Sequence, residues 1–390
     1  MKKLFILAAM LTGVSCTSTD STEKESSEEV VEEVAIIDSK TVKTLEIGTE
    51  APEFKLMGVD DKEYSLEDFE DADLLAVLFT CNHCPTAQAY EDRVQAYVND
   101  YKDKGVALVA ISPNADKAVR FDELGYTDLN DSFEEMKIRA KDKDYSYPYL
   151  YDGSTQEIAA KYGPIATPHV FLFDKERKLQ YVGRIDDDEY IGREKEHNLR
   201  DATEALLAGN TPSPAVTKTF GCSLKWMEKA EGKIKEVEGW AKEEVSLEKA
   251  SLAKLEEIMA NKSSGKYRLV NMWATWCGPC VAEFQGLVES DKMYRNRDFE
   301  FVTVSNDEAD NYDNTLSFLK KKYASNTNYI LEAGINKYDM IETIDPAWQG
   351  ALPYTVLISP SGEKVFAQMG EIDIQELRKA VADNIGRYFD

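Results

Sequence analysis

Apolar runs and helical periodicity alternate along the first half of the chain. The runs at residues 74–80 and 106–112 predict buried strands, and a helical pattern over 85–101 separates them. The apolar segments that follow predict a pair of strands joined by a polar turn, at 169–174 and 179–185. Two short helices complete the pattern, at 156–162 and 199–208. This alternation predicts an α/β fold.

The same plan returns after a loop rich in proline and serine at residues 210–214. The strands predicted in this second copy are 268–274, 299–304, 354–359 and 363–369. The helices predicted with them are 247–260, 279–293, 315–323 and 374–388. Two copies of one βαβ…ββα plan predict two domains, each a mixed β-sheet sandwiched by helices.

The composition agrees with a chain of two domains and disfavours several classes of function. A chain of 390 residues fits two or three domains at roughly 100–200 residues each, and its 43% hydrophobic content is enough for sizeable cores. The formal net charge of −26 disfavours binding to nucleic acid or to anionic lipid headgroups. No apolar run reaches the roughly 18–20 residues that a membrane-spanning helix needs.

The N-terminus has the pattern of an export signal. Lys2 and Lys3 precede the apolar residues 4–11, and small residues lead directly to Cys16, which predicts a signal peptide over 1–16. The small residues before Cys16 resemble the lipobox of bacterial lipoproteins, which implies lipidation of Cys16 and a membrane contact through that anchor alone. An ordinary signal peptide with an incidental cysteine is the alternative. Export would place the chain in the cell envelope or periplasm, where disulfides persist.

An acidic segment follows the signal. Residues 17–35 carry seven acidic side chains against one lysine, so a solvated, flexible tether is predicted over 17–42.

Four of the remaining five cysteines form two C-x-x-C pairs, each directly after a predicted strand and at the start of a helix. The N–H groups and the dipole of a helix N-terminus stabilise a thiolate, and this makes a cysteine nucleophilic. We therefore predict that Cys81 and Cys277 attack, and that Cys84 and Cys280 resolve the mixed disulfide.

Metal binding is the competing interpretation. Paired zinc motifs usually lie roughly 15–20 residues apart, whereas 192 residues separate Cys84 from Cys277. No histidine follows either pair, so covalent haem attachment is excluded as well. No metal site and no cofactor is predicted. A redox-dependent module for a soft metal such as Cu(I) ranks behind the dithiol, because no Met-rich or His-rich stretch lies near either pair.

The second motif, W-A-T-W-C-G-P-C at residues 273–280, resembles the active site of exported TlpA/ResA-type thiol–disulfide oxidoreductases, which have a thioredoxin fold. The resemblance covers 246–390. It implies that Leu352-Pro353 forms a cis-proline site, that Glu283 tunes the thiols, and that the partners are protein thiols or disulfides with an external electron donor.

The first half is similar to the peroxiredoxin-like (AhpC/TSA) branch of this fold over 43–222, with a charged linker at 223–245. The resemblance rests on A-P-E-F at 51–54, on C-N-H-C-P-T at 81–86, and on Thr167-Pro168 as a second cis-proline site. Peroxiredoxins have Thr or Ser where Cys81 stands, and an Arg that this chain lacks near Pro168. A dithiol function is therefore favoured, and a thiol peroxidase with Cys84 as the peroxidatic cysteine is the alternative.

Two further residues bear on the first site. His83 lies between the cysteines, and its positive charge is expected to stabilise the Cys81 thiolate and make this pair the stronger oxidant. Cys222 is interpreted either as a resolving thiol or as a small buried hydrophobe, and the sequence favours neither.

Overall fold

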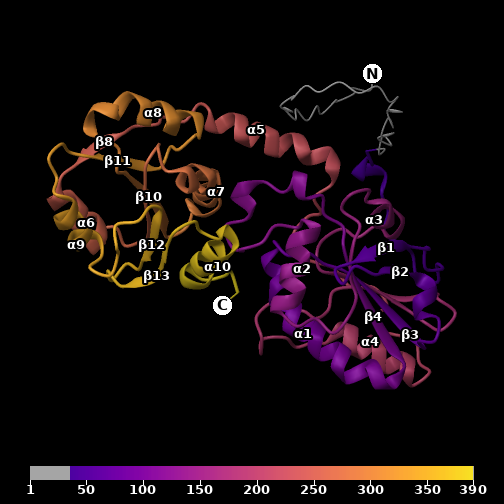
Figure 1. Cartoon of the computed structure of the whole chain (residues 1–390). Coiled ribbons are helices and arrows are strands. Elements are labelled where there is room, and N and C mark those ends of the chain that lie inside the picture. The colour runs from indigo at the N-terminus through magenta and orange to yellow at the C-terminus, as the bar shows by residue number, and fades with distance from the viewer. Residues whose placement is uncertain (1–35, 390) are drawn as a thin grey trace, which may run out of the picture. The chain divides into compact units, whose positions relative to one another are not determined.

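In the computed structural model, residues 36–389 are described, and they form two β-sheets flanked by helices (Figure 1). The predicted signal peptide, Cys16 and most of the predicted tether lie outside the described residues. Within the described part, no helix is long and apolar enough to cross a membrane.

The first sheet has seven strands in the order β2-β1-β5-β4-β3-β6-β7. The strands are β1 (Lys55–Gly58), β2 (Glu63–Ser65), β3 (Leu74–Phe79), β4 (Val106–Ser112), β5 (Tyr149–Tyr151), β6 (His169–Phe173) and β7 (Leu179–Gly183). The helices of this part are α1 (Pro85–Tyr101), α2 (Phe133–Asp142), α3 (Glu157–Tyr162), α4 (Asn198–Leu207) and α5 (Ala230–Trp240). Because β3 pairs parallel with β4 and antiparallel with β6, the sheet is mixed.

The second sheet has six strands in the order β13-β12-β9-β10-β11-β8. The strands are β8 (Glu248–Ala250), β9 (Tyr267–Trp273), β10 (Phe299–Ser305), β11 (Thr327–Leu331), β12 (Tyr354–Ile358) and β13 (Lys364–Met369). The helices are α6 (Leu252–Ala260), α7 (Gly278–Tyr294), α8 (Tyr312–Lys321), α9 (Lys337–Ile344) and α10 (Ile374–Ile385). Strand β9 pairs parallel with β10 and antiparallel with β12, so this sheet is mixed as well.

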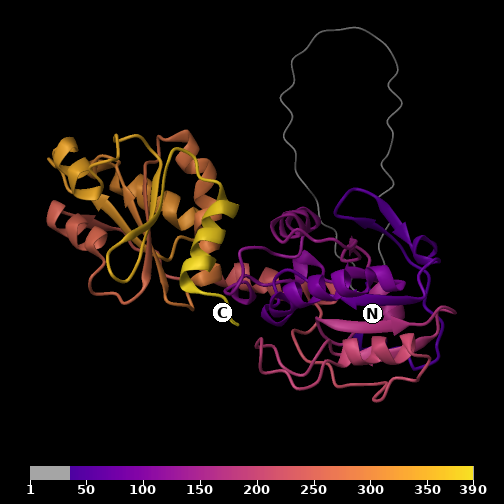
Figure 2. The ribbon, with the colours of Figure 1, turned by 90° about the horizontal axis from the view of Figure 1, so that it is seen from below.

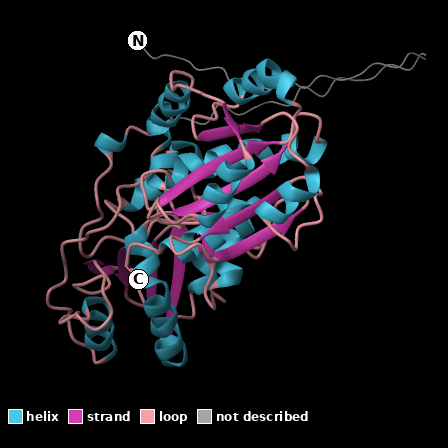
Figure 3. Ribbon diagram, turned by 90° about the vertical axis from the view of Figure 1, so that its left-hand side faces the viewer, coloured by secondary structure: helices cyan, strands magenta, loops and turns pink. Residues whose placement is uncertain are grey.

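Strand β3 is apolar along its whole length because both faces of the sheet are covered there. Along β3, the residues Leu75, Val77 and Phe79 belong to one core cluster, and Leu74, Ala76 and Leu78 belong to another. Alternate side chains of a strand point to opposite faces, so each face of the sheet has its own core. Figures 2 and 3 show the strands lying between helices.

Five strands follow the same order in both sheets, since β5-β4-β3-β6-β7 matches β11-β10-β9-β12-β13. The strand before each C-x-x-C motif, β3 or β9, is central, and the strand after each X-Pro pair, β6 or β12, lies beside it. The sheet therefore brings each cysteine pair next to its proline. The division into domains at 43–222 and 246–390 remains a prediction.

Several predicted boundaries differ from the structure by a few residues, and the largest of these differences is at the start of α6. The helix expected over 247–260 begins only at Leu252, because Glu248–Ala250 pair with β11 as a short edge strand. Ser251 then caps the helix by accepting a hydrogen bond from the Lys254 N–H.

Candidate thiol–disulfide sites

The first site lies where β3 ends and α1 begins. Cys84 is the N-cap of α1 and Pro85 is its first helical residue, a position that suits proline because its missing N–H is not needed there. Cys81 lies three residues before this N-cap. Both thiols are buried, with exposed fractions of 3% for Cys81 and 0% for Cys84. The prediction that the first cysteine of this motif occupies the helix terminus is therefore wrong.

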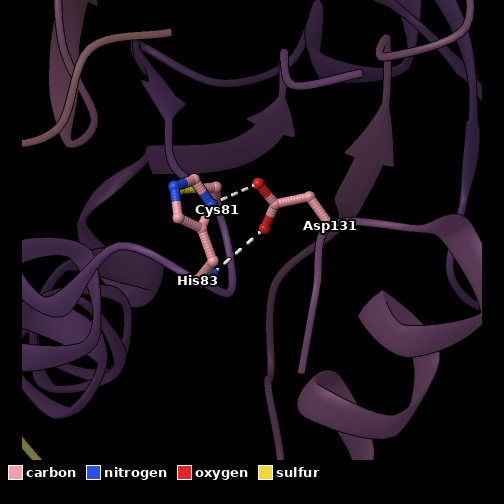
Figure 4. A group of neighbouring side chains, drawn as sticks. All are labelled: Cys81, His83 and Asp131. Carbon is pink, nitrogen blue, oxygen red and sulfur yellow. Dashed lines mark hydrogen bonds and ion pairs between the residues drawn. The ribbon is translucent and has the colours of Figure 1, made fainter. Parts of the chain in front are cut away.

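A buried ion pair supports the loop between the two cysteines. The Asp131 Oδ2 lies 2.5 Å from the His83 Nδ1, and Asp131 Oδ1 accepts hydrogen bonds from the N–H groups of Asn82 and His83. Asn114 Nδ2 donates to the same carboxylate at 2.8 Å. Figure 4 shows the carboxylate facing His83 with a bond to each oxygen. This network fixes the loop and places a positive charge beside the thiols.

The pKa shifts of this pair agree with an ion pair. Burial alone would lower the pKa of His83, but the Asp131 charge outweighs it and raises that pKa. Burial would likewise raise the pKa of Asp131, and the charge of His83 lowers it instead. The imidazolium and the carboxylate stabilise each other in a site from which water is excluded.

The pKa values of the two thiols in the first motif are shifted in opposite directions. Burial works against the Cys84 thiolate, yet hydrogen bonds from Cys222 and Cys81 and the charge of His83 hold the pKa of Cys84 well below its ordinary value. Burial, donation to Cys84 and the negative charge of Asp131 raise the pKa of Cys81 well above its ordinary value. These shifts favour Cys84 as the more readily ionised thiol of the first site, whereas the sequence predicts Cys81 as the attacking thiol.

Thr167 and Pro168 lie against the same thiols. Their peptide bond is cis, the Thr167 Oγ1 lies 3.2 Å from the Cys81 sulfur, and the Thr167 carbonyl lies 3.2 Å from the Cys84 sulfur. When Cys84 is protonated, it donates to this carbonyl. Cys222 packs against Cys81 and Cys84, so three thiols meet at one point. This clustering favours the interpretation of Cys222 as a participant in the site.

In the second site, a disulfide joins Cys277 and Cys280. Here the first cysteine is the N-cap of α7, and its sulfur accepts a hydrogen bond from the Cys280 N–H at 3.3 Å. Cys280 is fully buried, whereas 6% of Cys277 is exposed. The assignment of Cys277 as the attacking thiol and Cys280 as the resolving thiol agrees with this placement.

A cleft of about 620 Å³ opens beside Cys277. Its lining includes Pro279, Gly350 and Leu352, and Trp276, whose side chain is 70% exposed. The Leu352-Pro353 peptide bond is cis, as the resemblance implied. An exposed indole beside a cleft that is lined by Cys277 offers apolar contact area to an incoming chain.

Glu283 follows Cys280 by one turn of α7, so both side chains lie on the same face of the helix. Its carboxylate accepts hydrogen bonds from the Ile372 N–H at 2.8 Å and from Asn271 at 3.2 Å. Burial outweighs both bonds and raises the pKa of Glu283 to about 7. Glu283 can therefore hold or release a proton beside the dithiol near neutral pH.

This raised pKa predicts that the free energy of unfolding falls as the pH rises from about 5 to 8. The folded chain holds a proton on Glu283 up to about pH 7, whereas the unfolded chain releases it near its ordinary pKa of about 4.3. The loss should be about 1–2 kcal/mol once solvent screening of this carboxylate is included, measured from denaturant unfolding at both pH values. Glu283→Gln should flatten this dependence, and Glu289→Gln on the same helix should not. An unchanged slope in Glu283→Gln would contradict the shift.

Among residues 36–389, one group could present ligands to a metal: Cys81, His83 and Asp131 each offer one atom, and these atoms lie within 4.8 Å of one another. His83 Nδ1 and Asp131 are already bonded to each other, and the carboxylate also accepts from two backbone N–H groups and Asn114. The Asp131 carboxylate and the His83 Nδ1 are therefore used within the protein, and the geometry fits thiol tuning better than an open metal site.

Comparison with known protein families matches residues 47–182 and 243–365 to the AhpC/TSA family. These two segments together make up more than half of the sequence. The chain belongs to the AhpC/TSA family. The predicted fold class, α/β with two mixed sheets between helices, is confirmed, and the relationship to thioredoxin-like proteins agrees with the sequence resemblance.

Two curated relatives of this AhpC/TSA chain are named thiol-disulfide oxidoreductase ResA. The protein from Oceanobacillus iheyensis is 27% identical over 135 residues, which cover 32% of this chain and 61% of the relative. The protein from Bacillus subtilis is 30% identical over 101 residues, which cover 26% of this chain and 51% of the relative. The match thus spans less than two thirds of either relative.

Solved structures are similar over parts of the chain. A hypothetical protein from Sinorhizobium meliloti is 32% identical and covers 48% of this chain and 97% of its own, with a TM-score of 0.42. The thioredoxin domain of a thiol-disulfide oxidoreductase from Bacteroides vulgatus is 19% identical. The match covers 35% of this chain and 86% of that domain, with a TM-score of 0.29.

Sequence reasoning missed Asp131 and Asn114, which complete the first site of this AhpC/TSA chain. Both lie in loops far from the cysteines in sequence, and Asp131 is one of 72 acidic residues. The one local signal was the short polar run Asn130-Asp131-Ser132, which is typical of a loop before a helix, and Ser132 does cap α2. No local pattern linked that loop to His83.

Proposed function

We propose that this protein is an exported thiol–disulfide oxidoreductase that exchanges disulfides with protein substrates through the Cys277/Cys280 dithiol. The observation that carries the proposal is the disulfide at the N-terminus of α7, with Cys277 at the cap and an open cleft beside it. The relatives named thiol-disulfide oxidoreductase support the same reaction class. Two C-x-x-C motifs, one in each thioredoxin-like half, make this a tandem protein.

The reaction follows from the positions of the two sulfurs. Cys277, as a thiolate, attacks a substrate disulfide, forms a mixed disulfide and releases the first substrate thiol. Cys280 then attacks the Cys277 sulfur, which releases the second substrate thiol and closes the disulfide that the structure contains. An external electron donor returns the pair to the dithiol.

Reduction of insulin by the full chain, with dithiothreitol as donor, tests the proposal. Chain separation should proceed well above the rate with dithiothreitol alone. A rate equal to that background would contradict the proposed activity.

The Cys84 site favours a second candidate, a thiol peroxidase. Cys84 is a helix N-cap with a lowered pKa, and Pro85-Thr86 follow it. Against this, Cys81 stands where peroxiredoxins have a hydroxyl residue. Peroxide consumption that far exceeds the insulin rate and disappears in Cys84→Ser alone would favour the peroxidase.

Export rests on the N-terminal sequence pattern. If Cys16 is lipidated, Cys16→Ala should move the protein from the membrane fraction to the soluble envelope fraction in its bacterial host, and an inhibitor of lipoprotein processing should alter its maturation. Immunoblotting of the fractions measures the change. Unchanged partitioning in both experiments would leave an ordinary signal peptide as the explanation.

A further inference from the structure

In the first site, the backbone of Thr167 is paired with the chain's own Cys222. The Thr167 N–H donates to the Cys222 carbonyl at 2.9 Å, and the Cys222 N–H donates to the Thr167 carbonyl at 3.2 Å. These two bonds form one step of an antiparallel ladder. Both polar backbone groups of Thr167 are therefore in use, and no incoming strand can pair there without displacing residues 221–222.

The close fit of this pairing requires a glycine. Gly221 has φ +134°, and a Cβ at that position would lie 2.1 Å from the Thr167 carbonyl oxygen. Any other residue would push the segment away from Thr167 or strain its own backbone.

The segment is anchored on both sides of this contact. Before it, the Thr217 Oγ1 accepts a hydrogen bond from the Arg184 N–H at 3.0 Å. After it, the Lys225 N–H donates to Asn114 Oδ1 at 2.9 Å, and the Leu224 and Trp226 side chains are buried. The pairing with Thr167 is therefore a built-in part of the fold.

Cys222 is the most exposed of the three thiols. Its side chain is partly exposed and packs against Cys81 and Cys84, of which the second is fully buried. Cys222 is therefore the residue of the three that lies nearest to solvent.

The second site lacks such an occupant. The backbone of Leu352, which precedes the corresponding proline, makes no hydrogen bond to any residue from 36 to 389. Leu352 instead lines the cleft together with Trp276 and Cys277. One of two sites of the same fold is thus filled by its own chain, and the other is open.

We propose that residues 221–222 act as a built-in substrate strand, which closes the first site to protein disulfides and supplies Cys222 as the sulfur that exchanges with low-molecular-weight thiols. This rests on the proposed thiol–disulfide exchange activity and assigns a different substrate class to each site: proteins to the second, and small thiols and disulfides to the first.

The exchange balances as follows. A small thiolate RS⁻ attacks the Cys222 sulfur of a Cys84–Cys222 disulfide, which forms Cys222–S–S–R and releases Cys84 as a thiolate that His83 and Cys81 stabilise. A second RS⁻ attacks the sulfur of R, which gives RSSR and leaves Cys222 to take up a proton. Two small thiols are oxidised, one protein disulfide is reduced, and the reverse sequence reoxidises the site with RSSR.

The test uses the full chain with Cys277→Ser and Cys280→Ser, so that only the first site can react. After oxidation with glutathione disulfide and an acid quench, peptide mapping should find Cys84 linked to Cys222, and brief treatment with glutathione should place the adduct on Cys222. A dominant Cys81–Cys84 disulfide, or an adduct on Cys84, would overturn the proposal.

Insulin provides the second arm. The Cys277→Ser/Cys280→Ser chain should reduce insulin no faster than the dithiothreitol background. Adding Gly221→Ala should raise this rate about tenfold, the effect expected from freeing two backbone hydrogen bonds for the substrate. The matched control is Gly209→Ala, since Gly209 also has a positive φ (+76°) but has nothing within 4 Å of its Cβ position.

The disulfide mapping and the insulin assay together distinguish a failure of this proposal from a failure of the proposed function. If the Cys277→Ser/Cys280→Ser chain reduces insulin at a rate comparable to the intact chain, the proposal that residues 221–222 close the first site to proteins is wrong. An intact chain that does not reduce insulin would contradict the proposed function, while the disulfide mapping would still decide the role of Cys222. If Gly221→Ala does not fold, the mapping alone decides.

Discussion

Cys277→Ser is expected to lower the rate of insulin reduction by about a hundredfold or more. A serine hydroxyl at the N-cap of α7 is not ionised at neutral pH and cannot attack a disulfide, whereas the Cys277 thiol is held at the helix terminus beside the cleft. The first site should not compensate, because its peptide edge is filled. The measurement is the initial rate of insulin precipitation at a fixed dithiothreitol concentration.

Cys280→Ser is the matched control, because it removes the resolving step and keeps the attacking thiol. This variant should accumulate a mixed disulfide between Cys277 and insulin, visible on a non-reducing gel. Equal rates for Cys277→Ser and the unchanged chain would show that the second site is not the reactive one.

The second large effect concerns the reduction potential of the first site. Asp131→Asn keeps an oxygen for the N–H groups of Asn82 and His83 but removes the charge that holds His83 as an imidazolium. The Cys84 thiolate then loses a stabilising charge, and the pKa of Cys84 should rise. A less stable thiolate favours the disulfide, so the potential of the disulfide that contains Cys84 should fall, by about 30 mV for each tenfold change in the exchange equilibrium.

Titration in glutathione buffers, with Cys277→Ser/Cys280→Ser as the background, measures this potential. Ultraviolet absorbance of the thiolate as a function of pH gives the Cys84 pKa independently. Asp71→Asn, an exposed carboxylate in the same half, is the control. In the unchanged chain, the first site should have a higher potential than the Cys277/Cys280 pair, and equal potentials would remove the basis for electron flow from the second site to the first.

The strands and helices that bury most of their surface were predictable from the sequence. The helix 85–101 and the strand 106–112 agree residue by residue with α1 and β4, because apolar side chains recur there at one period over many residues. The elements that were missed are short or polar, such as β1, β5 and α2. Strands of three or four residues are positioned by their neighbours in the sheet, and a sequence window of that length carries no periodicity.

The cysteine motifs were predictable, but the position of the helix cap in the first motif was not predicted correctly. The helical pattern was seen to start at Pro85, and a proline at that position places the helix cap on Cys84. In the second motif, Pro279 lies before the second cysteine, and the cap falls on Cys277. The His83–Asp131 pair and the Thr167–Cys222 bridge join residues separated by 48 and 55 positions, and only the folded chain brings them together.

Because Cys84 caps α1 as Cys277 caps α7, the two helix N-termini can be compared position by position. The residue that corresponds to Cys280, three positions into the helix, is Ala87, which is buried and packs against Cys81 and Cys84. The first half therefore has the helix position of a second thioredoxin dithiol but lacks its partner sulfur. A single Ala87→Cys substitution would create the sequence C-P-T-C, with spacing and helix register equal to those of C-G-P-C at 277–280. One side chain thus separates a three-thiol centre from a duplicated thioredoxin motif.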